Sequence, residues 1–128
     1  MDKTTFISEI TDPLKKSGYK KYRHYWFRPA GYCTICVFVQ GSQWDKACYY
    51  VEIGAIERTD LTKPVPNYDW DIRHRCAGAN GEDHISPDEF LNKLNQFEEN
   101  LSEISSLSEF LSKINAVKVA NQFFFDDF

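Results

Sequence analysis

The sequence lacks the features expected of a membrane-anchored or exported protein. Its 128 residues include no apolar run close to the roughly 18 residues that a membrane-spanning helix needs. The opening residues, MDKTTFISEI, contain no apolar signal-peptide core. These two absences predict a cytoplasmic protein without a membrane partner.

Catalytic motifs are also missing. We find no Ser/His/Asp spacing, no phosphate-binding loop and no carboxylate-rich metal motif. His24 and His74 are interpreted as core or edge histidines, and His84 as a solvent-facing neighbour of a helix start. The sequence therefore leans away from an enzyme and predicts no cofactor and no metal.

Internal repeats and low-complexity linkers are absent too, so residues 1–128 are expected to form a single domain. Hydrophobic residues make up 42% of the chain and aromatic residues 16%, which is enough for a packed core and argues against disorder.

The four cysteines include one C-x-x-C pair, Cys33 and Cys36, within GYCTICVFVQ. A zinc or redox site is one interpretation and a buried strand is the other. Side chains alternate along a strand, so these two thiols would point to opposite faces of a sheet and could not share a metal or form a disulfide. No second C-x-x-C pair is present, and buried thiols are therefore favoured over both kinds of site.

Charge is unevenly distributed along the chain. Residues 1–81 carry 12 Lys and Arg against 9 Asp and Glu, a net +3, whereas residues 82–128 carry 3 Lys against 10 Asp and Glu, a net −7. An acidic half argues against general nucleic-acid binding and favours a protein partner with a basic patch. The run KKSGYKKYR at residues 15–23 interleaves cations with aromatics, as single-strand binders do, but it straddles a helix end and a strand.

The hydrophobic pattern predicts an α+β fold. We expect an N-terminal helix over residues 2–17 that kinks near Pro13 and ends at Ser17-Gly18. Strands are expected over residues 19–28, 32–40, 46–57 and 68–76, with loops at residues 41–45, 58–67 and 77–83. Two helices with capping boxes follow, at Ser86-Pro87-Asp88-Glu89 and at Ser106-Leu107-Ser108-Glu109, the second continuing to Val117. Short connections predict an antiparallel four-stranded meander sheet with all the helices packed on one face.

Expected hairpin registers sort the strand residues into two faces. Turns at Pro29-Ala30 and near Gln43 would place Trp26 opposite Cys33 and Val37 opposite Tyr49. The predicted core face comprises Tyr22, His24, Trp26, Cys33, Ile35, Val37, Val39, Tyr49, Val51 and Ile53. The opposite, open face comprises Arg23, Tyr25, Phe27, Thr34, Cys36, Phe38, Cys48, Tyr50 and Glu52, joined by Asp71, Arg73 and Arg75.

The open face mixes aromatic rings with Arg and carboxylate groups, the side chains that dominate interface energy. A structural interpretation is that the aromatics are strand formers that pair across the sheet beside a solvated, charged rim. On the binding interpretation, the candidate site residues are Arg23, Tyr25, Phe27, Tyr50, Glu52, Asp71, Arg73 and Arg75.

Several short segments together resemble a known family. They are Gly18-Tyr19-Lys20-Lys21, Trp26-Phe27-Arg28, Val39-Gln40-Gly41-Ser42, Tyr49-Tyr50-Val51-Glu52-Ile53-Gly54 and Trp70-Asp71-Ile72-Arg73-His74-Arg75. The pattern resembles the bacterial family catalogued as domain of unknown function 4304, over roughly residues 3–115. The resemblance implies one α+β domain and transfers no catalytic residue.

The leading hypothesis is a protein-binding module that uses the open face or the acidic helical half. A toxin-neutralising immunity protein is a concrete version, since an acidic surface steers fast association with a basic toxin. The alternative is a small-molecule binder or enzyme in which Arg73 and Arg75 hold an anionic ligand, with Glu52, Asp71 or Tyr50 as acid/base groups. A homodimer through the aromatic face is a third hypothesis. The sequence leaves undecided whether the Phe123-Phe124-Phe125 tail packs on its own core.

Overall fold

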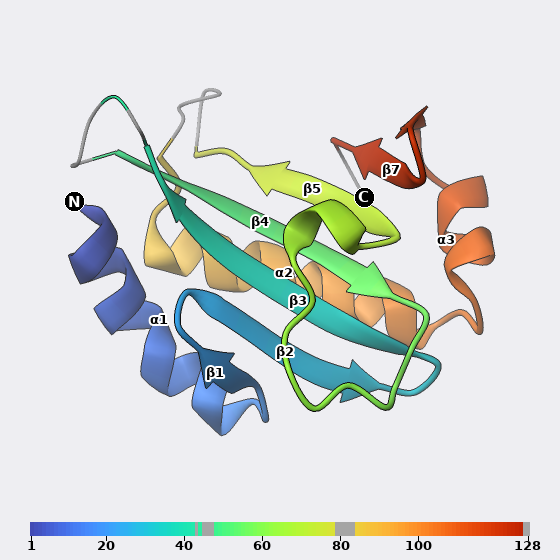
Figure 1. Cartoon of the computed structure of the whole chain (residues 1–128), viewed down its shortest axis with the longest axis horizontal. Helices are drawn as coiled ribbons and strands as arrows, with labels where there is room; N and C mark the ends of the chain where they lie inside the picture. Colours follow the sequence, from blue (N-terminus) through green and yellow to red (C-terminus); the bar gives the residue numbers. More distant parts are fainter. Residues whose placement is uncertain (43, 45–47, 79–83, 127–128) are drawn as a thin grey trace.

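The computed structural model describes residues 1–42, 44, 48–78 and 84–126. Among these residues the chain forms an α+β fold in which seven strands build one mixed sheet (Figure 1). The strand order is β1-β2-β3-β4-β5-β7-β6. The α+β class is confirmed, whereas the four-stranded antiparallel meander is too small and lacks the parallel β5–β7 pair.

The described elements have the following bounds. The strands are β1 (Lys20–Tyr22), β2 (Tyr25–Ala30), β3 (Cys33–Gly41), β4 (Tyr49–Ile56), β5 (Ile72–Cys76), β6 (Ala116–Val119) and β7 (Gln122–Phe125). The helices are α1 (Lys3–Lys16), α2 (Pro87–Ser102) and α3 (Leu107–Ser112), with a single 3₁₀ turn at Asn67–Asp69.

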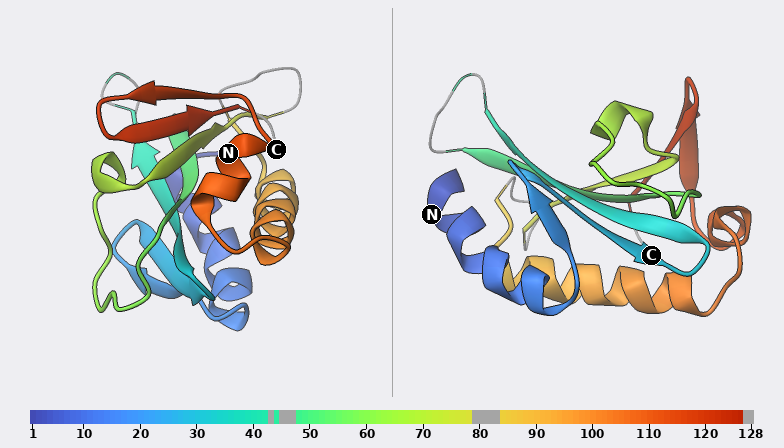
Figure 2. Two further views of the ribbon diagram at one scale, coloured as in Figure 1. Left: turned by 90° about the vertical axis from the view of Figure 1, so that its right-hand side faces the viewer. Right: turned by 60° about the horizontal axis from the view of Figure 1, so that its bottom comes forward.

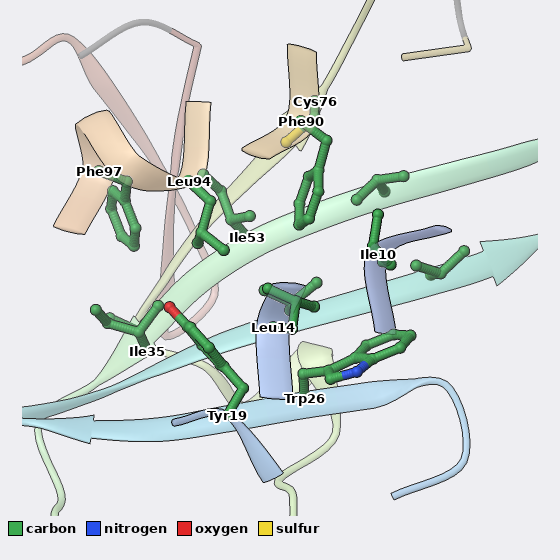
Figure 3. Close-up of a cluster of buried hydrophobic side chains, with 14 of the residues drawn as sticks. Ile10, Leu14, Tyr19, Trp26, Ile35, Ile53, Cys76, Phe90, Leu94 and Phe97 are labelled. Carbon is green, nitrogen blue, oxygen red and sulfur yellow. The ribbon is translucent and has the colours of Figure 1, made fainter. Parts of the chain in front are cut away.

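Helices α1 and α2 lie along one face of the sheet, and the segment that joins β4 to β5 crosses the other face (Figure 2). The main core lies between the helices and the sheet, where Leu14 of α1 and Phe90 of α2 meet Trp26 and Ile53 of the strands (Figure 3). All four of these side chains are buried. The helices cover this face of the sheet because its side chains are apolar and are buried against them.

The predicted ends of α1 and the predicted start of α2 agree with the local capping chemistry. The Asp2 side chain accepts a hydrogen bond from the Thr5 amide at 2.8 Å, and Gly18 follows the C-terminal end of α1 with a φ of +91°. Pro13 lies within α1. At α2, the Ser86 hydroxyl caps the Glu89 amide and the Glu89 carboxylate reaches back to the Ser86 amide, so this capping box is confirmed. The capping box predicted at the start of α3 forms only in part, because Ser106 caps the Glu109 amide at 3.2 Å whereas the Glu109 carboxylate accepts a hydrogen bond from Ser105.

The predicted strand over residues 19–28 is in fact a hairpin. Strand β1 pairs with β2 so that Tyr22 lies opposite Tyr25, and Arg23-His24 forms the two-residue turn, with Arg23 at a φ of +56°. Residues that pair directly across two strands share a face of the sheet, so Tyr22 lies on the same face as Tyr25. The assignment of Tyr22 to the core face was therefore wrong, and its side chain is exposed.

The predicted registers were also wrong, but the faces predicted for the residues of β2 to β4 were right. Trp26 pairs with Val37, whereas Ala30 pairs with Cys33 across a turn at Gly31-Tyr32. Val37 pairs with Ile53. In each of these two hairpins the observed partner lies four residues beyond the expected one, since Trp26 pairs with Val37 and not with Cys33, and Val37 pairs with Ile53 and not with Tyr49. Side chains alternate between the faces of a strand with a period of two, so a shift of four residues leaves each side chain on its predicted face. Hence Cys33 and Val37 stay on the helix side as predicted.

The C-terminal region departs most from the prediction. Helix α3 ends at Ser112 instead of continuing to Val117, and residues 116–125 form the hairpin β6–β7, whose turn includes Ala120 at a φ of +56°. Strand β7 then pairs in parallel with β5, placing Phe123 beside Ile72. Phe125 is buried among Phe97 and Phe110, so the aromatic tail packs on its own core.

Candidate functional site

A row of side chains crosses the sheet on the face away from the helices. In the observed registers Tyr22, Tyr25, Phe38, Glu52 and Arg75 lie side by side on five successive strands. The Tyr25 and Phe38 rings are stacked, with centroids 4.3 Å apart. The row therefore begins with three aromatic side chains at the β1 edge and ends with two charged ones near the middle of the sheet.

This face is not open along its whole length. The segment between β4 and β5 crosses it and covers an apolar cluster of Phe27, Cys36, Ile56 and Trp70, each at most 5% exposed (Figure 2). The Trp70 indole donates a hydrogen bond to the Val65 carbonyl at 2.9 Å. Phe27 is thus a core residue of a second, smaller cluster, and its prediction as part of an open face was wrong.

Strand β4 contributes the residue that lets the crossing segment approach the sheet. A Cβ atom on Gly54 would lie 2.2 Å from the Ile72 carbonyl oxygen and 2.5 Å from Trp70 Cε3. Only glycine leaves room for the Trp70 ring against β4. Trp70 does not belong to the predicted strand over residues 68–76, because it precedes β5 and packs on the face opposite the main core.

Glu52, in the charged end of the row, belongs to a buried polar network that Arg73 joins from the neighbouring strand. Arg73 Nη2 donates to both Glu52 carboxylate oxygens at 2.9 Å, and the Asn67 side-chain amide donates to the same carboxylate. Arg73 Nη1 donates to Gln122 Oε1 at 3.2 Å, and Gln122 Nε2 donates in turn to the Trp70 carbonyl at 2.9 Å. This network ties β4, β5, β7 and the crossing segment together, which is a structural role.

Three further site candidates lie at the edges of this network. The Asp71 carboxylate accepts a hydrogen bond from the Glu57 amide at 2.8 Å. Arg75 is exposed, and its guanidinium lies 4.7 Å from the centroid of the half-buried Tyr50 ring. Asp71 and the Arg75–Tyr50 pair are therefore separate from the aromatic end of the row.

The remaining two candidates, Arg23 and Tyr25, line a hollow of about 540 Å³, which we call the aromatic groove. Its lining residues are Tyr22, Arg23, His24, Tyr25, Phe38, Pro64 and Pro66. One wall comes from the turn β1–β2 and from β3, and the other comes from the crossing segment. The Tyr22 side chain is 51% exposed, and the Arg23 guanidinium lies 5.7 Å from its ring centroid.

The electrostatic environment of the groove is positive. Of the described residues that line it, none is acidic and Arg23 carries a permanent positive charge. The pKa of His24 is lowered by partial burial and by the nearby positive charges of Lys3 and Lys21, which keeps the imidazole neutral near pH 7. The groove is cationic although the chain has a net charge of −4.

Four of the seven described residues that line the groove were not predicted to lie on this face. Tyr22 and His24 were assigned to the core face, and Pro64 and Pro66 fell within the loop predicted over residues 58–67. The missed signal was local, because a Tyr-Arg-His-Tyr stretch between aromatic strand residues can form a two-residue turn. No local signal brings Pro64 and Pro66 to the same place, since that contact depends on the path of the crossing segment.

A second hollow lies on the helix side, at the far end of β2 and β3. It measures about 370 Å³ and is lined in part by Arg28, Tyr32 and Glu98. The Arg28 guanidinium forms an ion pair with Glu98 and lies 5.2 Å from the Tyr19 ring centroid. Burial and the Glu98 charge raise the pKa of the Tyr19 hydroxyl. The charged groups of this second hollow, Arg28 of β2 and Glu98 of α2, are therefore paired with each other.

The thiols lie as the strand pattern predicted. Cys33 belongs to the helix-side core and Cys36 to the cluster beneath the crossing segment, on opposite faces of β3. Burial raises the pKa of the Cys33 thiol to about 11. Within the described residues no group of three or more His, Cys, Asp or Glu side chains is arranged to hold a metal ion. Residues 79–83 of the loop predicted over residues 77–83, and Gln43 of the predicted turn, lie outside the described residues.

None of the described helices is long and apolar enough to cross a membrane. Neither the curated proteins nor the solved structures include a significant match to the chain. One family model does match, over residues 10–109, and its description is "Domain of unknown function (DUF4304)". This match begins within α1, spans β1 to β5 and α2, and ends within α3, and it agrees with the resemblance expected from the sequence. The chain therefore belongs to the DUF4304 family.

Proposed function

We propose that this protein is a binding module that recognises another protein in the cytoplasm through the aromatic groove. The observation that supports the proposal best is the groove itself, a hollow of about 540 Å³ with an exposed Tyr22, an adjacent Arg23 and a stacked Tyr25–Phe38 pair at one edge of the sheet. Tyr and Arg are among the residues that contribute most to binding energy at interfaces, particularly where they line a pocket.

The charge distribution supports a particular version of this proposal. Residues 82–128 carry a net −7 and include α2 and α3. The crossing segment, which contributes one wall of the groove, lies on the face of the sheet opposite α2. A bacterial immunity protein would use its acidic surface to steer a basic toxin and the groove to hold a segment of that toxin that is not itself basic. The groove then provides specificity and the acidic helices raise the association rate.

Site-specific photo-crosslinking tests the proposal. Tyr22 is replaced with p-benzoylphenylalanine in the native host, and Val117 carries the same group in a control protein. The two positions are 51% and 67% exposed and lie on strands at opposite edges of the sheet. We expect irradiation to give a discrete heavier adduct from position 22 but not from position 117, with one partner protein identified in it by mass spectrometry. Equal or absent adducts at both positions would refute a partner at the groove.

The alternative, an anionic small molecule held by Arg73 and Arg75, has less support. Arg73 already engages both oxygens of Glu52, and its side chain is 14% exposed. The observation in its favour is that Arg73 Nε is buried and has no hydrogen-bond partner among the described residues. Thermal-shift screening with phosphates and carboxylates tests it. A stabilising anion whose effect disappears in Arg75→Ala would favour this alternative over the protein partner.

A further inference from the structure

The aromatic groove has two walls of different composition. Tyr22, Tyr25 and Phe38 form one wall, because their registers place them in a row across β1, β2 and β3. Pro64 and Pro66 form the other wall, from the segment that crosses the sheet. The hollow between them is therefore bounded by flat rings on one side and by two proline rings spaced one residue apart on the other.

The crossing segment is attached firmly enough to keep this shape. Trp70 Nε1 donates to the carbonyl of Val65, the residue between the two prolines, at 2.9 Å. The Tyr25 hydroxyl lies 3.4 Å from the Asn67 amide, which donates to it. Both prolines also have a restricted φ angle. The Asn67–Tyr25 hydrogen bond therefore links the two walls, and the Trp70–Val65 bond anchors the crossing segment between its two prolines, so a ligand meets a preformed site.

Ridges of aromatic and proline rings suit a particular backbone conformation. A polyproline II helix repeats every three residues with a rise of about 3.1 Å per residue and has no internal hydrogen bonds, so its rings and carbonyls both face outward. Such segments dock in grooves lined by aromatic side chains, and their stiffness lowers the entropy lost on binding. Tyr22 and Tyr25 offer ring faces for pyrrolidine rings, and Arg23 offers donors for the exposed carbonyls.

The charge of the residues that line the groove limits further which class of ligand can bind there. Arg23 is a cation, His24 stays neutral near pH 7, and none of the described lining residues is acidic. A basic peptide would therefore find no counter-charge, whereas an acidic residue beside the prolines would pair with Arg23. Single-stranded nucleic acid fits less well, because it needs a track of several cations for its phosphates and the groove provides one permanent charge.

We propose that the aromatic groove binds a proline-rich segment of a protein partner in the polyproline II conformation, with an acidic residue next to Arg23. The proposal rests on the proposed function and names the chemistry of the partner. The groove binds the segment through stacking of prolines on Tyr22 and Tyr25 and through one ion pair at the turn β1–β2.

Peptide titration followed by amide chemical shifts tests the inference. The probes are synthetic oligoprolines that end in aspartates at one terminus or the other, an oligoproline that ends in lysines, and a Gly/Ser peptide with the same aspartates. A single-stranded oligothymidylate is the nucleic-acid probe. We expect saturable binding of an aspartate-ended oligoproline, with the largest shifts at Tyr22, Arg23, Tyr25 and Phe38, and weaker or no binding of the other probes.

Matched variants assign the binding to the groove. Tyr22→Ala removes a mostly exposed ring and is expected to weaken binding about tenfold, the equivalent of one interface contact of about 1.4 kcal/mol. Tyr68→Ala removes an exposed tyrosine that does not line the groove, and affinity should not change. Arg23→Glu should reverse the preference from aspartate-ended to lysine-ended oligoproline. The amide spectra of all three variants verify that each one is folded.

The failure of this inference is distinguishable from the failure of the proposed function. If no oligoproline saturates, or if Tyr22→Ala binds as tightly as the wild type, the polyproline inference is overturned. Tighter binding of oligothymidylate in the groove would also overturn it. A specific crosslink from position 22 in that case would still support a protein partner of another kind, whereas the loss of both results would remove the protein-binding proposal as well.

Discussion

Arg73 forms its ion pair with Glu52 diagonally across β4 and β5, although Arg75 is the residue directly opposite Glu52 in the sheet. Arg75 instead lies against Tyr50, at 4.7 Å from the ring centroid. Glu52 is only 2% exposed. Arg73, which pairs with it, also donates a hydrogen bond to Gln122 and is therefore held within the buried network. The two arginines therefore have different roles, and only Arg75 is exposed to a ligand.

Neutralising Glu52 should destabilise the protein strongly. Glu52→Gln leaves the Arg73 charge largely buried without its counter-ion, and we expect the free energy of unfolding to fall by about 3–5 kcal/mol. Urea denaturation gives the value. The matched control is Asp60→Asn, which removes an exposed partner of Arg58 and should cost about 0–1 kcal/mol. A small, equal loss in both variants would show that the buried pair is not a stabilising element.

Adding one methyl group at Gly54 should disturb the whole crossing segment. A Cβ there would lie 2.2 Å from a backbone oxygen, which cannot move aside as a flexible side chain would. We expect Gly54→Ala to lower the free energy of unfolding by about 1–3 kcal/mol or more, because overpacking forces backbone shifts. In Gly41→Ala the nearest atom is the flexible end of Lys3, at 3.2 Å, and the effect should be small. Similar unfolding midpoints for the two variants would contradict the packing described here.

Truncating Phe125 should show that the C-terminal hairpin is part of the core. Its ring is buried against Phe97 and Phe110, so Phe125→Ala should lower the free energy of unfolding by about 3–5 kcal/mol. Val117→Thr, at an exposed position of β6, should change it by less than about 0.5 kcal/mol. Thermal unfolding of both variants checks this, and an unchanged midpoint in Phe125→Ala would mean that the tail does not pack on this core.

Alkaline pH should unfold the protein in part through its buried thiols. Burial raises the pKa of Cys33 from 9.0 to about 11 and that of Cys76 from 9.0 to about 12. The folded state thus keeps protons that the unfolded state releases, so this contribution is complete below pH 9 and is lost as pH rises through these two values. Cys76→Ala should make the decline of stability between pH 9 and 12 less steep, measured by urea unfolding at several pH values. An unchanged slope would mean that this thiol does not contribute.

Local patterns in the sequence were sufficient for several elements. The Ser86–Glu89 capping box places the start of α2, and Gly18 ends α1, because both signals act within one helical turn. The division of β2 to β4 into two faces was also predictable, since an error of an even number of residues in register leaves each side chain on its face. For the same reason Cys33 and Cys36 could be placed on opposite sides of β3.

Tertiary structure decided the character of the face opposite the helices. Nothing local to residues 57–71 indicates that Trp70 will pack over Gly54, or that Pro64 and Pro66 will form a wall beside Tyr25. These contacts join positions far apart in the chain, and their energy depends on burial that exists only once the sheet has formed. The same holds for β7, which reaches β5 in parallel only after α2, α3 and β6 bring it there. Local patterns thus set which residues alternate along β2, β3 and β4, whereas long-range packing sets which of them belong to the core, the polar network or the groove.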